Sequence, residues 1–230
     1  MSPQVFADLF SPANVRYILA GLRTTLLISI VTVLLSVFWG SVLALLRNYG
    51  KKTLGRFASI YIEIFRSTPL LLWILICIFM LPFGNALIRG TLGLTLYTSS
   101  VIAEIVRGGL NSVEKGQFEA ARSQGFSFFQ TLLYIVLPQC FMRIVPSLMS
   151  QIITTIKDTS FFAQFAIAEF FFNSKQLMGI ISKDTVVTSA HIFVLYCFIA
   201  LVYFVINFAL SCIVRKLARN EQSLSLHPEQ

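Results

Sequence analysis

The stretch TTLLISIVTVLLSVFWGSVLALL, residues 24–46, lies between Arg23 and Arg47 and contains no charged residue. About 20 apolar residues are enough for an α-helix to cross the roughly 30 Å hydrocarbon core of a bilayer. The run is too long for a strand of a membrane β-barrel, which needs only about 10 alternating residues. It therefore predicts a membrane-spanning helix, and we expect an all-α integral membrane protein.

The composition of the whole chain supports this class. Of its 230 residues, 56% are hydrophobic and 12% are charged, and the mean hydropathy is +0.78. A soluble domain carries about 25% charged residues. The formal net charge of +8 could suggest a nucleic-acid partner. We do not expect one, because the basic residues cluster at the ends of apolar runs, as they do in membrane proteins.

Five stretches are apolar and long enough to be predicted as membrane spans within a single transmembrane domain, residues 1–230. They cover about 20–46, 60–81, 91–110, 138–156 and 188–214. Pro69 and Pro146 fall inside two of them, at positions where a helix start or a kink tolerates proline. The first apolar run starts too late and is too long for the apolar region of a cleaved signal peptide.

The basic residues of the loops predict the orientation. The first connection carries four basic residues, whereas the second, LPFGNALIRG, carries only Arg89. The segment after the fifth span is basic again. Because cytoplasmic loops are enriched in lysine and arginine, we expect the N-terminus outside and the C-terminus in the cytoplasm. Residues 111–137 then form a cytoplasmic loop.

The central part of this loop, KGQFEAARSQGFS at residues 115–127, has the features of a short capped helix. Asn111 with Glu114, and Ser127 with Gln130, fit patterns typical of helix starts. Gly125 is placed to end a helix over about 117–124 in a left-handed conformation. A second helix, FFQTLLYIV, would follow and be interrupted by Pro138. On spacing alone, an ordinary amphipathic loop between two spans explains the segment equally well.

A family resemblance favours a specific role for this loop. GQFEAARSQGFSFFQTLLYIVLPQ resembles the EAA loop of permease subunits of binding-protein-dependent ABC importers, and the matching positions are Glu119, Ala120, Ala121, Gly125, Ile135, Leu137 and Pro138. FRSTPLL at 65–71, IAEIVRGGLNSVEKGQ at 102–117 and KDTS at 157–160 are similar to polar amino acid permeases, the group with histidine, glutamine, arginine and opine importers. The chain departs from that pattern at Ser67 and at Phe161.

The resemblance implies five transmembrane helices of the type I importer kind with a cytoplasmic coupling helix. It also implies two ATPase subunits, a second permease copy or paralogue, an extracytoplasmic binding protein and an amino acid substrate, in the inner membrane of a bacterium. The residues implied to couple to the ATPase are Gly116, Gln117, Glu119, Ala120, Ala121 and Gly125. ATP would bind to the partner, and the sequence contains no phosphate-binding loop, dinucleotide fingerprint or metalloprotease motif.

Two groups of polar residues in or beside the predicted spans are candidates for the substrate pathway. Glu104 and Arg107 are three residues apart and share a helical face. A charge in the bilayer costs on the order of 3 kcal/mol by insertion scales, so Glu104 should face a hydrated path or an internal ion pair. Asp158, Thr159 and Ser160 could bind a zwitterion or could simply cap a helix end.

Two other functional classes are weighed against the ATP-driven permease. A gradient-driven secondary transporter or a channel subunit would work without an ATPase, and such transporters usually have more spans or internal repeats. A membrane enzyme would need a nucleophile–base pair or a metal cluster. The four cysteines form no C-x-x-C pair, so we expect apolar side chains in helices, with no metal and no disulfide.

Overall fold

The computed structural model describes residues 3–183 and 185–226, and this part of the chain is helical without strands. The helices are α1 (Pro3–Leu9), α2 (Pro12–Tyr49), α3 (Lys52–Ser67), α4 (Leu70–Met80), α5 (Ala86–Ser112), α6 (Lys115–Ser123), α7 (Phe128–Thr131), a π-helical turn (Leu132–Val136), α8 (Leu137–Asp158), a 3-10 helix (Thr159–Phe165), α9 (Phe170–Ile181) and α10 (Ser189–Leu226).

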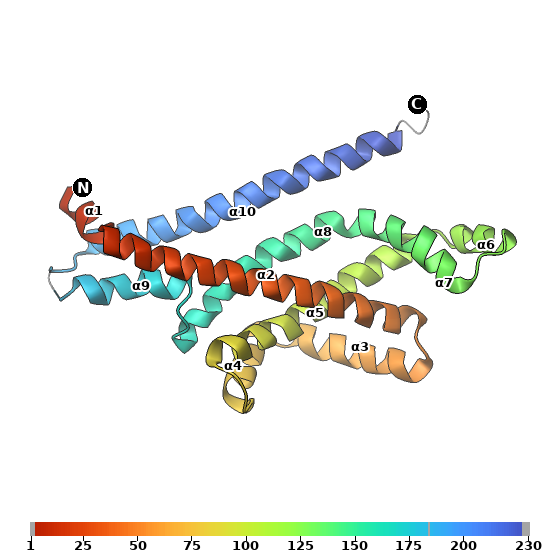
Figure 1. The fold of residues 1–230 in the computed structure, drawn as a ribbon, viewed down its shortest axis with the longest axis horizontal. Helices are drawn as coiled ribbons and strands as arrows, with labels where there is room; N and C mark the ends of the chain where they lie inside the picture. The colour runs from red at the N-terminus through yellow and green to blue at the C-terminus, as the bar shows by residue number, and fades with distance from the viewer. Residues whose placement is uncertain (1–2, 184, 227–230) are drawn as a thin grey trace.

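The long helix α2 runs along the bundle and packs mainly against α5 (Figure 1). The short helices α6 and α7 lie at one end of the molecule, beside the end of α2 and the start of α3. The N-terminal helix α1, α9 and the start of α10 lie at the opposite end. The N-terminus and the predicted cytoplasmic loop are therefore at opposite ends of the bundle.

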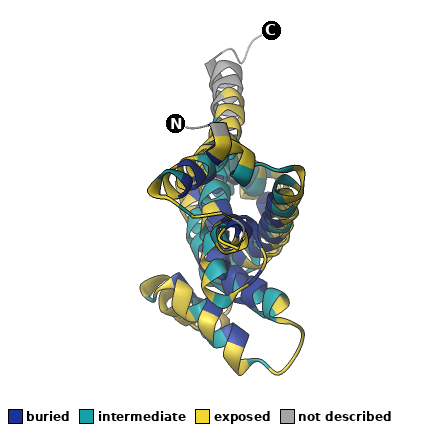
Figure 2. Cartoon of the chain, turned by 90° about the vertical axis from the view of Figure 1, so that its left-hand side faces the viewer, coloured by how far each residue is buried: buried dark blue, intermediate teal, exposed yellow. Residues whose placement is uncertain are grey.

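Three clusters of buried residues hold the bundle together. One joins α2, α5 and α8 near the 111–137 loop, one joins α1, α2, α9 and α10 at the opposite end, and one lies between α2, α4 and α5. In Figure 2, buried segments of the helices face the inside of the bundle and exposed segments lie on the outside. Many exposed residues are large and apolar, as expected for helices that face lipid.

Four segments of the described chain are long and apolar enough to cross a membrane. They are Pro12–Tyr49, Ala86–Ser112, Phe128–Phe165 and Ser189–Ile213, and the bent pair α3–α4 makes a fifth if it is one span. The predicted spans 20–46, 91–110 and 138–156 each fall within one of these segments, as does nearly all of 188–214. The side chains of Arg215 and Arg219, in the basic segment after the fifth span, lie outside the described ones.

The predicted span over 60–81 is divided between α3 and α4. The chain bends by 105° between α3 and α4. Pro69 lies at the corner, where it lacks an N–H and disfavours a helical residue before it. The corner is tightened by Trp73, whose indole Nε1 donates to Thr68 Oγ1 at 2.6 Å and whose ring stacks on Phe65 at 4.0 Å.

The expectation that Pro138 interrupts the helix FFQTLLYIV of the 111–137 loop is wrong. α7 continues through the π-helical turn directly into α8, and Pro138 is in the first turn of α8. The wider π turn changes which carbonyl lies opposite each N–H, so it can accommodate a proline that donates no hydrogen bond. As a result, one continuous helical segment leads from the loop into the membrane-spanning part.

Candidate coupling loop and substrate pathway

Helix α6 is a single short helix with a well-defined C-terminal cap. The N–H of Phe126 donates to the carbonyl of Ala121 at 3.0 Å, and the N–H of Gly125 donates to the carbonyl of Arg122 at 3.0 Å. These two bonds form a Schellman motif. Gly125 has φ +83°, a left-handed conformation that favours glycine. The predicted cap at Gly125 is confirmed, with a helix over 115–123 in place of the expected 117–124.

The two predicted helix starts differ in outcome. Ser127 and Gln130 form a complete capping box at the start of α7, as predicted. The pairing of Asn111 with Glu114 is wrong, because Asn111 lies inside α5 and accepts a hydrogen bond from Asn48 at 2.9 Å. Glu114 precedes α6 without a side-chain hydrogen bond. α5 continues for two turns beyond Glu104, and this extension takes Asn111 away from the start of α6.

Aromatic side chains fasten the loop to the end of α2. The Tyr49 ring lies 6.3 Å from the Phe118 ring and 5.4 Å from the Phe128 ring, centroid to centroid. Gln139 of α8 donates to Gln117 Oε1 at 3.4 Å. The loop is therefore in contact with both α2 and α8.

The candidate coupling residues fall into an exposed group and one buried residue. Gly116, Gln117, Glu119, Ala120 and Gly125 are exposed. A Cβ added to Gly116 or Gly125 would meet no atom within 4 Å, so this surface is open to close approach. Ala121 is only 3% exposed and packs against its own chain. Its side chain is therefore not part of the exposed surface of α6.

Glu104 is the centre of an ion-pair cluster that joins three helices. Its carboxylate accepts from Arg107 Nε at 2.9 Å and Nη2 at 2.8 Å, and from Arg47 of α2. Arg66 of α3 lies 3.8 Å away, and Glu63 pairs with Arg47 at 3.4 Å. The Glu104 side chain is only 15% exposed. Its pairing with Arg107 is confirmed, and the carboxylate is engaged by arginines from α2 and α5.

A polar cavity of about 360 Å³ lies between α5 and α8 beside this cluster. Glu104 lines it with Gly108 and Ser112 of α5 and with Arg143 and Ser147 of α8. Arg143 Nη1 donates to the Ser112 carbonyl and, at 3.2 Å, is within reach of its hydroxyl. The helices meet closely at Gly109, where an added Cβ would come within 2.2 Å of Ile144. The cavity thus presents one carboxylate, one guanidinium and hydroxyl groups.

The structure separates the two groups of candidate pathway residues. Asp158 ends α8 and is half-buried, as is Ser160, whereas Thr159 is buried and donates to the Ile156 carbonyl at 2.7 Å. At about 1.5 Å per residue, the helix from Arg143 to Asp158 is about 22 Å long. Glu104 and Asp158 therefore do not belong to one binding pocket.

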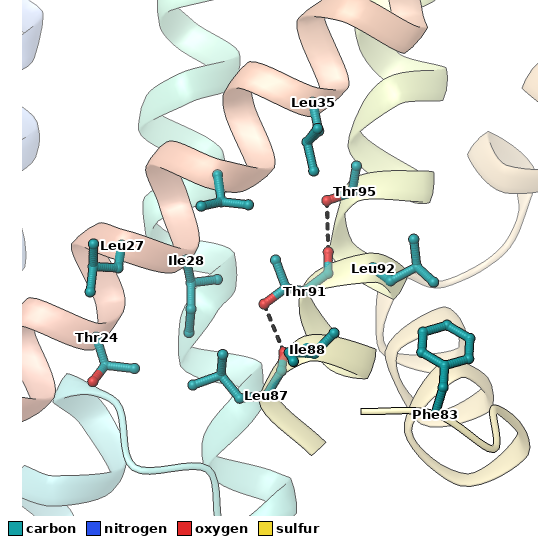
Figure 3. Close-up of a pocket in the computed structure, with 11 residues that line it drawn as sticks. Thr24, Leu27, Ile28, Leu35, Phe83, Leu87, Ile88, Thr91, Leu92 and Thr95 are labelled. Carbon is teal, nitrogen blue, oxygen red and sulfur yellow. Dashed lines mark hydrogen bonds between the residues drawn. The ribbon is translucent and has the colours of Figure 1, made fainter. Parts of the chain in front are cut away.

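A larger cavity of about 480 Å³ between α2 and α5 has a different chemistry (Figure 3). Leucine, isoleucine and valine side chains line most of it. Its threonine hydroxyls donate within their own helices, Thr91 to Leu87 at 2.7 Å and Thr95 to Thr91 at 2.7 Å. The hydrogens of all three lining threonine hydroxyls are thus used within the protein, and no charged side chain lines this cavity, so the cavity beside Glu104 is the better candidate for the substrate.

The described residues contain no group of three or more histidine, cysteine, aspartate or glutamate side chains that could hold a metal ion.

The model of the family "Binding-protein-dependent transport system inner membrane component" matches residues 33–222. The chain belongs to this family. It is a multi-pass inner membrane permease subunit of an ABC importer, and ATP hydrolysis belongs to separate subunits. Such permeases work with ATPase and substrate-binding partners.

The relatives and solved structures agree with this assignment. The chain is 35% identical over 216 residues to the "Probable glutamine ABC transporter permease protein GlnP" of Bacillus subtilis (strain 168), covering 92% of this chain and 97% of that protein. It is 30% identical over 218 residues to the "Glutamate/aspartate import permease protein GltK" of Escherichia coli O6:H1, covering 90% and 94%.

Two solved structures have the same fold. An amino acid ABC transporter crystallised with histidines matches with a TM-score of 0.77 and 27% identity, over 90% of this chain and 94% of that one. The inward-facing MetNI methionine ABC transporter matches with a TM-score of 0.71 and 20% identity, over 90% and 99%. The predicted all-α permease fold is confirmed.

Sequence reasoning assigned no role to several residues that organise the permease's loop and cavity. In the sequence, Arg47, Arg66 and Arg143 are basic residues near the ends of apolar runs, and no pattern marks Tyr49. Each acts through a residue distant in sequence, as Arg47 does through Glu104, 57 positions away. One signal in the sequence could have suggested these ion pairs. A glutamate inside a predicted span, such as Glu104, needs a partner, and arginines at the ends of the other spans can supply one.

Proposed function

We propose that this permease forms half of the translocation pathway of a polar amino acid importer. A second copy or a paralogue would supply the other half, and an extracytoplasmic binding protein would deliver the substrate. The GlnP and GltK relatives support amino acids with amide or acidic side chains. The cavity between α5 and α8 is the observation that carries this proposal, because it offers the Arg143 guanidinium for a carboxylate and the serine side chains of Ser112 and Ser147 for polar groups of the substrate.

Two cytoplasmic ATPase subunits would dock on the loop 111–137, one on each permease, and would bind the ATP. The exposed residues Gly116, Gln117, Glu119 and Ala120 would contact the ATPase, while Ala121 and Gly125 would hold α6 in shape. This arrangement requires the N-terminus outside and the C-terminus in the cytoplasm. The aromatic contacts from Tyr49 to the loop would carry the ATPase's movement to α2.

Glu104 would line the inner part of the path and orient its arginines, and Asp158, Thr159 and Ser160 would lie at the other end. Asp158→Asn keeps the size of the side chain and removes its charge. If Asp158 attracts the substrate's ammonium group, uptake should fall more for cationic than for neutral amino acids, with basal ATP hydrolysis unchanged. Equal uptake of every amino acid by Asp158→Asn would remove this residue from the path.

The experiment that tests the function is reconstitution of the permease with its ATPase and binding protein in proteoliposomes. We expect glutamine- or glutamate-loaded binding protein to raise ATP hydrolysis severalfold and to drive uptake that stops without ATP. Uptake that follows an ion gradient and ignores ATP would instead favour the gradient-driven alternative. Stimulation by a different solute alone would keep the permease assignment and replace the substrate.

A further inference from the structure

Helix α8 is amphipathic although it lies within a membrane-spanning segment. One face is buried against neighbouring helices and includes Cys140, Ile144 and Leu148. A second face is apolar and more exposed, with Phe141 and Met142 at least half exposed and Met149 partly exposed. The third face, which we call the polar face of α8, consists of Arg143, Ser147, Ser150, Gln151, Thr154 and Asp158.

The spacing of the polar face follows the helix period from Arg143 to the end of α8 at Asp158. Its residues recur at intervals of three, four and one, and at 100° per residue they fall within an arc of about 100°. All six are exposed or half-buried in this subunit, so the bundle does not cover them. Directly opposite lies the apolar face, which is suited to lipid. Two faces of such different polarity cannot both contact hydrocarbon chains at low cost.

The polar face continues into the cavity beside Glu104. Arg143 and Ser147 belong to both, and α5 contributes Gly108 and Ser112 to the same hollow. An added Cβ at Gly108 would meet nothing within 4 Å, so the hollow is open at that point. The cavity is therefore one end of a longer polar surface.

The charges at the two ends of this surface differ in sign. Asp158 ends it at one side, and Arg143 lies at the loop side, about 22 Å away at 1.5 Å per residue. None of the ion pairs in the described part of the chain includes Arg143. In the hydrogen bonds of the described residues, its guanidinium donates only to the neutral carbonyl and hydroxyl of Ser112. It is therefore able to donate to a substrate carboxylate.

We propose that the polar face of α8 is one wall of the hydrated path of the substrate, and that Arg143 binds the substrate's α-carboxylate at its loop end. The inference rests on the proposed function, because the path needs a second permease to close its other side. The ligand is a zwitterionic amino acid. Ser147, Ser150 and Thr154 would offer hydroxyl groups along the way, and water would fill the remaining space.

The test uses cysteine accessibility in the assembled complex of permease and ATPase, with the native cysteines replaced by alanine. Single cysteines replace Ser147, Ser150 or Thr154 on the polar face, and Met142 or Met149 on the apolar face as controls. Met149 is the matched control for Ser150, since the two are neighbours at the same depth. The probe is the membrane-impermeant cation trimethylammonium-ethyl methanethiosulfonate, which reacts only with hydrated thiolates.

We expect the three polar-face cysteines to react at least tenfold faster than the two controls. We also expect 10 mM glutamine or glutamate to slow the reaction at Ser147→Cys, which lies one turn from Arg143. Equal rates on both faces, or no reaction on the polar face of a complex that still imports an amino acid, would overturn the proposal. The second result would mean that this face packs against the other permease.

A second variant tests the role of Arg143. Arg143→Gln should abolish the protection of Ser147→Cys by the amino acid while leaving its rate without amino acid within twofold. Arg56→Gln, at an exposed arginine of α3 outside the cavity, is the control and should leave the protection unchanged. Unchanged protection in Arg143→Gln would remove the carboxylate contact. Fast labelling in a complex that transports some other solute would keep the path and reject the amino acid.

Discussion

Single side chains in this permease join elements that are far apart in the chain. Glu104 collects arginines from α2 and α5 with a third from α3 nearby, and Tyr49 holds the coupling loop through two aromatic contacts. A largely buried carboxylate with several guanidinium donors is stable as a group, but the loss of its charge leaves cations without a partner. Removing the charge of a single residue in such a cluster should therefore have a large effect on the stability of the permease.

Glu104→Gln should destabilise the permease by about 2 kcal/mol, the scale of hydrogen bonds to charged groups. The amide cannot balance Arg47 and Arg107, whose positive charges would remain close together. The measurement is the fraction of folded complex after stepwise heating in detergent. Glu63→Gln is the matched control: its side chain is 66% exposed, so a loss below about 1 kcal/mol is expected. Equal losses would contradict a central role for Glu104.

Gly125→Val should weaken coupled transport, whereas Gly125→Asn should retain most of it. The left-handed conformation at φ +83° costs a β-branched residue on the order of 1–2 kcal/mol and is tolerated by asparagine. No atom lies within 4 Å of the would-be Cβ, so the cost comes from the backbone alone. The measurement is ATP-dependent uptake at matched membrane levels. Full uptake by the valine variant would show that the Schellman turn is dispensable.

At the scale of elements, α6 is a short helix with one exposed side and one side that packs against the rest of the chain. Its C-terminal cap, the Tyr49 contacts and the hydrogen bond between Gln117 and Gln139 attach it to α2, α7 and α8. The exposed side presents glycine and alanine, so another protein can approach the backbone closely. The continuous segment from α7 through the π turn into α8 connects this unit to the polar face of α8.

Ala120→Arg and Ala121→Arg should fail in different ways. Ala120 is exposed, so an arginine there should leave folding intact and block the ATPase by its size. Ala121 is 3% exposed, so an arginine there should disrupt the packing of α6 and lower the yield of folded permease. Size-exclusion profiles report folding, and co-purification of the ATPase reports docking. ATPase binding by Ala120→Arg at the normal level would place the docking surface elsewhere.

The whole molecule separates its functions along its length. The loop 111–137 lies at one end and α1 with α9 at the other, and α8, which carries the polar face, spans much of the distance between them (Figure 1). The apolar cavity between α2 and α5 is apart from this route, and its threonine hydroxyl groups donate within their own helices. This division agrees with a subunit that receives a substrate at one membrane face and responds to an ATPase at the other.

The orientation of the chain is tested at this scale by two single cysteines in a background without native cysteines. Pro82→Cys lies in the exposed connection between α4 and α5, and Lys115→Cys lies on the exposed side of α6. An impermeant thiol reagent should label the first from outside intact cells and the second only after permeabilisation. The basic first loop and the basic segment after the fifth span are the reason for this expectation. Labelling of both from outside would reject the proposed orientation.

The sequence by itself determined the class of the protein, the short helix within 111–137 and the Gly125 cap. These features depend on local properties: the length of apolar runs, the residues that cap helices and the conformations that glycine allows. Ser127 with Gln130 succeeded for the same reason, because a capping box involves only neighbouring residues. The pairing of Asn111 with Glu114 failed because the packing of α5 extended that helix.

Only the tertiary structure decided the bend at Pro69, the burial of Ala121 and the arginine cluster on Glu104. Each depends on which helix packs beside which, and hydrophobic periodicity describes the faces of one helix without naming its neighbour. Glu104 and Asp158 were grouped as carboxylates of one pathway, yet packing places Glu104 beside Arg143 and leaves Asp158 about 22 Å along α8, at 1.5 Å per residue. Contacts between residues such as Arg47 and Glu104, 57 positions apart, arise from packing that no local pattern encodes.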